Sequence, residues 1–195
     1  MKKINLLMIF CFVLLITSCS KSVDNNQWQA VISENKVNSL PEIFSQIKTE
    51  KVVEILSSKD TIKASQQNKI LANQIASYFQ SKYKIDITQE FKNNPEGIVI
   101  LGIFYAKKEA IEAKSKIKSF SINSYQRYSD DMDCLMAAVS TAIGISQARD
   151  IWRSVMAGAT EATILSTVKL LARRVAAAWT VVAMVYEVGG CLDFW

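Results

Sequence analysis

Cysteine is the residue type through which this chain could do the most chemistry, and it occurs as Cys11, Cys19, Cys134 and Cys191. A thiol can be acylated, oxidised to a disulfide, or used as a nucleophile when a base activates it. Histidine is absent from all 195 residues, which excludes Ser-His-Asp and Cys-His catalysis and every histidine-dependent metal site. The sequence therefore favours covalent modification of cysteine over enzymatic turnover.

Two glutamates are the next candidates, because Glu109 and Glu112 would share one face of a helix and could exchange protons. Lys107, Lys108 and Lys114 surround them, so we interpret the segment as a solvated helix surface with ion pairs. Mixed signs also differ from the dense basic face that nucleic acid requires. We expect no enzymatic activity, no cofactor and no nucleic-acid partner.

An acidic group follows at Asp130, Asp131 and Asp133. It could suggest a Ca²⁺ site, but it lacks the glycine turn and the later glutamate of an EF-hand loop. The favoured interpretation is that these carboxylates cap the next helix and interact with its dipole.

The N-terminus has the pattern of an export signal. Lys2 and Lys3 precede an apolar run from Leu6 to Ile16, and that run is too short for a lasting transmembrane helix. Residues 1–18 are expected to be removed, which would leave 177 residues with a net charge of +3.

The signal ends in Ile16-Thr17-Ser18-Cys19, which resembles the lipobox of bacterial lipoproteins. The resemblance covers the targeting segment alone. It implies that Cys19 is acylated, that cleavage precedes it, and that the chain is anchored in the cell membrane or outer membrane, on the periplasmic or surface side. The alternative is that Cys19 merely ends an ordinary secretory signal or is a free thiol.

Cys134 and Cys191 then remain as the two thiols of the mature chain. In an oxidising compartment we expect them to form a disulfide. Two buried free thiols, or a reactive thiol without a base, are the alternatives.

Six glycines and two prolines leave few turn formers, so the expected fold is all-α, with several short helices followed by a long C-terminal helical hairpin. The expected segments are a tether (19–26), a helical region (27–120), a linker (121–133) and the hairpin (134–195).

Ser39 and Glu42 have capping-box spacing around Pro41, which predicts a helix to about Ser57. Further helices are predicted over 65–82, 88–92 and 95–120. The apolar residues 98–105 could instead form a β-strand, although no second run of this kind would pair with it.

The predicted hairpin consists of helices from Asp133 to Ala157 and from Glu161 to Val188. They are joined through Gly158 to Thr160, where Gly158 ends the first helix and Thr160 caps the second. Antiparallel arms of nearly equal length bring Cys134 and Cys191 to the same end. Pairing positions that sum to about 325 also predicts an ion pair between Asp150 and Arg174.

Two functions compete for the apolar surface of the second arm. In the first, the protein is a lipid-anchored, non-enzymatic interaction or structural module of the cell envelope, with an unidentified protein partner. In the second, it is the precursor of a membrane-active peptide, since the hairpin is similar in composition to helical pore-forming bacteriocins without matching any of their motifs.

Overall fold

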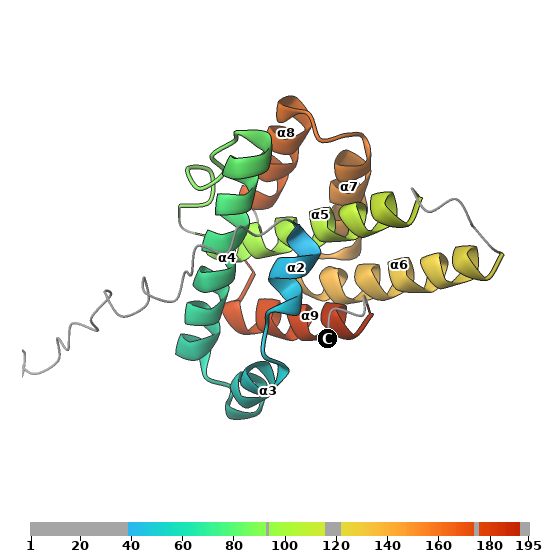
Figure 1. Cartoon of the computed structure of the whole chain (residues 1–195). Coiled ribbons are helices and arrows are strands. Elements are labelled where there is room, and N and C mark those ends of the chain that lie inside the picture. The colour runs from blue at the N-terminus through green and yellow to red at the C-terminus, as the bar shows by residue number, and fades with distance from the viewer. Residues whose placement is uncertain (1–38, 93, 116–121, 174–175, 192–195) are drawn as a thin grey trace, which may run out of the picture. The chain divides into compact units, whose positions relative to one another are not determined.

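The computed structural model describes residues 39–92, 94–115, 122–173 and 176–191, with the side chains of 115 and 122–131 left undescribed. All regular secondary structure in these residues is α-helical, so the all-α prediction is confirmed (Figure 1). The predicted signal segment, lipobox and tether, together with Arg174, lie outside the described residues.

The chain enters its first described helix as predicted. The Ser39 hydroxyl accepts a hydrogen bond from the Glu42 amide at the start of α2 (Leu40–Ser45), and proline occupies the first turn. The helix does not continue to Ser57, because a turn at 46–48 separates it from α3 (Thr49–Ser58). That turn lets Ile47 enter the core as well.

The third helix, α4 (Thr61–Tyr83), begins four residues earlier than predicted. Asp60 explains the difference, because its carboxylate accepts hydrogen bonds from the amides of Ile62 and Lys63, both at 3.0 Å. The short helix predicted over 88–92 is a turn.

The apolar segment that could have been a strand is helical. It belongs to α5 (Pro95–Ser115), which Asn94 starts by accepting a hydrogen bond from the Gly97 amide. α5 packs against α2, α4, α7, α8 and α9. A helix satisfies its backbone internally, so it can be surrounded by other helices without a strand to pair with.

The predicted linker 121–133 is wrong, because α6 (Ile122–Ile143) runs through most of it. Asp130, Asp131 and Asp133 consequently lie inside this helix and not at its N-terminus, so the capping interpretation is also wrong. The polar and aromatic composition of the segment led to the error, because it does not by itself exclude a helix.

The two long hairpin arms are each divided. The first arm comprises α6 and α7 (Ile145–Met156), which meet at Gly144 with a φ of 85°, a value that glycine adopts readily. The second comprises α8 (Glu161–Ala172) and α9 (Ala178–Cys191). The predicted turn between the arms is present, since Gly158 has a positive φ and Thr160 caps α8.

Pairing between the arms remains antiparallel although a single straight hairpin is absent from the described residues. α7 packs against α8, and α6 packs against α9 (Figure 1). Near the turn, the Ser154 hydroxyl lies 2.7 Å from that of Thr167, and at the far end of the arms Cys134 pairs with Cys191. The two residue numbers of a facing pair therefore add up to 321 near the turn and to 325 at the disulfide. The second arm therefore uses more residues at its bend than the first arm uses at Gly144.

Candidate functional site

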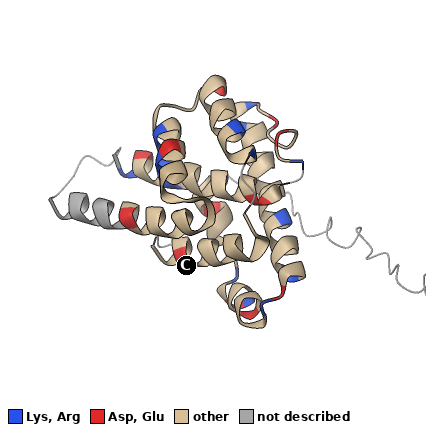
Figure 2. Cartoon of the chain, turned by 180° about the vertical axis from the view of Figure 1, so that it is seen from behind, with Lys and Arg blue, Asp and Glu red and all other residues tan. Residues whose placement is uncertain are grey.

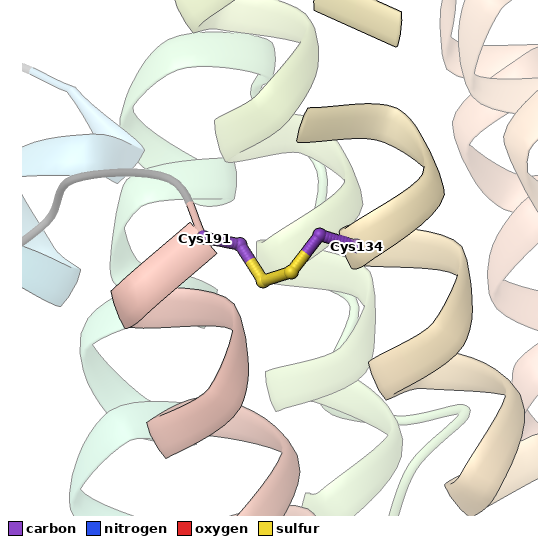
Figure 3. The surroundings of a disulfide bond; sticks show 2 residues. All are labelled: Cys134 and Cys191. Atoms are coloured by element: carbon purple, nitrogen blue, oxygen red, sulfur yellow. A yellow bond between two sulfur atoms is a disulfide. The ribbon is translucent and has the colours of Figure 1, made fainter. Parts of the chain in front are cut away.

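The covalent link of the described chain joins α6 to the last residue of α9. Cys134 and Cys191 form a disulfide with their Cα atoms 6.0 Å apart, and Figure 3 shows the two side chains meeting between the helices. The predicted pair is confirmed. Cys134 is exposed and Cys191 is half-buried, so the bond lies at the surface over a packed helix pair.

A second cluster, which we call the α5 cluster, consists of Tyr78, Lys82, Tyr83, Tyr105 and Glu109. One oxygen of Glu109 accepts hydrogen bonds from the Tyr78 hydroxyl and the Lys82 ammonium, both at 2.5 Å. The Lys82 nitrogen also lies 5.1 and 5.4 Å from the ring centroids of Tyr78 and Tyr83. Charge, hydrogen bonding and cation–π attraction therefore act on the same groups.

The other oxygen of Glu109 accepts a hydrogen bond from the backbone amide of Leu40 at 2.9 Å. Leu40 is the first residue of α2, where amides lack partners within the helix and the helix dipole is positive. A glutamate on α5 thus caps a helix that lies 69 residues earlier in the chain.

The neighbouring residue, Lys108, makes the complementary contact at another helix end. Its ammonium donates a hydrogen bond to the carbonyl of Val155, at 3.0 Å, in the last turn of α7. Carbonyls there carry the negative end of the helix dipole, which a cation stabilises. Adjacent side chains of opposite charge on α5 therefore bind helix ends of opposite polarity.

These positions correct the expectation of a solvated surface for residues 107–112. Lys107 is 2% exposed and Lys108 is 8% exposed. Glu112 does extend outward, with 57% of its side chain exposed, so the expectation holds only towards the end of the segment. The available signal was the apolar run 98–106, which is buried around the whole helix and continues into the two lysines.

Burial determines the acid–base properties of the tyrosines in the α5 cluster. It raises the pKa of Tyr105 to about 12. It also raises the pKa values of Tyr78 and Tyr83 well above the ordinary range, and the charge of Glu109 adds to both effects. Phenols in this state stay protonated at neutral pH, and Tyr78 uses its proton to donate a hydrogen bond to Glu109.

A third polar contact ties α4 to α5 and α9. The buried amide of Asn68 donates hydrogen bonds to the carbonyl of Ala178 at 2.9 Å and to the carboxylate of Glu96 at 3.4 Å. Like the α5 cluster, this contact connects segments that are distant in sequence. The described polar contacts therefore position helices relative to one another.

The predicted ion pair stays a prediction because Arg174 is not described. Asp150 lies on α7 and pairs with Arg153 of the same helix at 3.3 Å, with their side chains 62% and 77% exposed. On the side of the molecule drawn in Figure 2, basic and acidic residues are intermixed along the helices.

Within the described ranges, no three acidic or cysteine side chains gather as a metal site would require. The helices described there also include none whose length and apolar character would suffice to cross a bilayer. No protein family, no curated protein and no solved structure matches the chain.

Proposed function

We propose that this chain is a lipid-anchored protein of the cell envelope whose helical domain acts as a non-enzymatic interaction or structural module. The observation that carries the proposal is the burial of the apolar C-terminal helix within the common core. Val181, Val182, Met184, Val185 and Val188 of α9 are all buried. Their neighbours are α3, α4, α5 and α6, so α9 is part of the domain and not an appended segment.

The disulfide supports the exported location. Such bonds persist in oxidising compartments and are rare where thiol reductants dominate. The disulfide is also compatible with acylation of Cys19, because that assignment leaves Cys134 and Cys191 as the two thiols of the mature chain.

The bacteriocin-like alternative receives less support. Releasing residues 134–195 would separate α9 from α3, α4 and α5 and would expose the valines that they cover. At about 25 cal/mol per Å² of apolar surface, that exposure opposes release from the intact domain.

Metabolic labelling with an alkynyl fatty acid tests the anchor. The wild-type protein should take up label and float with membranes, whereas Cys19→Ala should do neither. Cys11→Ala is the matched control, because it removes a cysteine while leaving the proposed acylation site and the disulfide intact. Label retained by Cys19→Ala, or absent from the wild type, would contradict the proposal.

The module function is tested by crosslinking the labelled protein in intact cells and identifying what co-purifies. A stable envelope protein bound to the wild type is the expected result. Leakage of vesicles caused by the oxidised full chain would instead favour the membrane-active alternative.

A further inference from the structure

One face of α7 lies beside its core-facing side and is largely exposed. Its residues Ile145, Arg149, Trp152 and Met156 recur at intervals of four, three and four. At 100° per residue this spacing places them within an arc of about 60°. Ile145 is 55% exposed and Met156 is 43% exposed, so apolar surface lies open to solvent. We call these four residues the α7 stripe.

Most of the stripe lies outside the face by which α7 packs into the core. Ala148, Ile151 and Val155 form the face that enters the core, and Ser154 contacts α8 through Thr167. Trp152 is the one stripe residue with an inward contact, since its ring lies 6.3 Å from that of Phe104. Trp152 as a whole is half-buried.

The residue types of the α7 stripe are suited to contact with the headgroup region of a membrane. Exposed aliphatic side chains, a tryptophan and flanking arginines are the composition of helices that lie in a membrane interface. Arg149 lies in the arc and Arg153 borders it, both exposed. Asp150 offsets one of these charges but falls outside the arc, towards α8.

We propose that the α7 stripe docks onto the anionic lipid surface of the membrane that carries the anchor. This inference rests on the proposed acylation of Cys19. About 20 residues separate that cysteine from α2, and even a fully extended chain of this length reaches only about 70 Å. The domain is therefore held at a high local concentration near the bilayer, where a weakly binding face becomes occupied.

The test uses the mature lipidated protein reconstituted into vesicles that contain a bromine-labelled acyl chain. The signal of Trp152 is the difference in quenching between the wild type and Trp152→Phe, which keeps an aromatic ring beside Phe104. We expect this signal in vesicles of phosphatidylcholine with phosphatidylglycerol, and we expect it to decline without phosphatidylglycerol or at high salt.

Charge reversal provides the matched comparison. Arg149→Glu/Arg153→Glu should lower the ratio of docked to undocked protein at least about tenfold. Lys169→Glu/Arg173→Glu, on the exposed side of α8, makes the same change in net charge and should leave the Trp152 signal in place. Equal loss in both variants, or no Trp152 quenching in anionic vesicles, would overturn the proposal.

Flotation separates this proposal from the proposed anchor. If the protein fails to float with vesicles, the anchor is wrong, and unlipidated protein added to excess anionic vesicles then tests the stripe alone. If it floats and Trp152 remains unquenched, the anchor stands and the stripe does not contact lipid.

Discussion

Two helices carry similar mixtures of charged and apolar residues, and the fold uses them in opposite ways. In α5, Lys108 and Glu109 are drawn into the protein, and each binds the backbone at another helix end. In α7, Arg153 and Asp150 remain exposed and pair within their own turn. The difference arises because α5 is covered by other helices, whereas α7 lies against neighbours on part of its surface.

This contrast shows that the surroundings of a charged residue decide whether it stabilises the fold or stays exposed for binding. A buried charge with fixed partners is costly to truncate, because its partners lose their hydrogen bonds in a medium that water does not reach. An exposed pair contributes little to folding. The charges of α5 should therefore affect the stability of the fold. Those of α7 should affect binding at the exposed surface.

Opening the disulfide is expected to have the largest effect. Cys134→Ser/Cys191→Ser should lower the free energy of unfolding by about 4 kcal/mol, because the bond closes a loop between cysteines 57 residues apart. Chemical denaturation with and without a thiol reductant measures the loss. Since α9 covers part of α5, hydrogen exchange in α5 would show whether its cluster depends on this bond. An unchanged midpoint would contradict the prediction.

Removing the central carboxylate should come next. Glu109→Ala should cost about 3 kcal/mol, because the Leu40 amide, the Tyr78 hydroxyl and the Lys82 ammonium would all lose their acceptor. Glu109→Gln keeps an acceptor oxygen and should cost less.

The matched variant for this comparison is Asp150→Ala on α7, which should change the free energy of unfolding by less than about 0.5 kcal/mol. Urea denaturation measures all three proteins. Equal losses for Glu109→Ala and Asp150→Ala would remove the distinction between the two helices.

Alkaline pH should weaken the α5 cluster. Tyr105 ionises near 10 when unfolded and its pKa is raised to about 12 in the fold. The contribution of neutral Tyr105 to the free energy of unfolding is therefore complete below pH 10. It declines by about 1.4 kcal/mol per pH unit as the pH rises to 12. Tyr78 and Tyr83, whose pKa values are also raised, add to the decline, so Tyr105→Phe should remove only its own share of the slope in denaturation curves at pH 9 to 11. Tyr186→Phe, outside the cluster, is the control, and a slope unaffected by Tyr105→Phe would contradict the prediction.

The smallest expected effect concerns the predicted pair between Asp150 and Arg174. Each single reversal should cost less than about 1 kcal/mol, and the exchange of both charges should recover most of it. A double-mutant cycle in denaturant measures the coupling. If Asp150 couples to Arg153 and not to Arg174, the ion pair is wrong and α7 is independent of this contact.

Local signals in the sequence were sufficient where a short-range interaction decides the structure. Ser39 and Thr160 cap their helices as predicted, and Gly158 ends the first arm. The disulfide was predicted from the two cysteines that lie outside the N-terminal signal pattern and from antiparallel arms that bring them together. These features depend on hydrogen bonds within a few residues, or on the overall direction of the chain.

Errors occurred where the surroundings of a helix decide the result. The burial of Lys107 and Lys108 depends on which helices cover α5, and hydrophobic periodicity within α5 does not report them. The bends that divide the hairpin arms also reflect packing, since α9 packs against α3, α4, α5 and α6, whereas α8 packs against α5 and α7.

The sequence by itself determined that the described chain is helical, where several helices begin, and which two cysteines pair. The tertiary structure alone decided that Glu109 caps α2, that Lys108 binds the end of α7, and that most of the α7 stripe remains exposed. The reason is physical: capping and helix formation are set by nearby residues, whereas the burial of a charge depends on partners up to 69 residues away, which reach it only once the helices have packed.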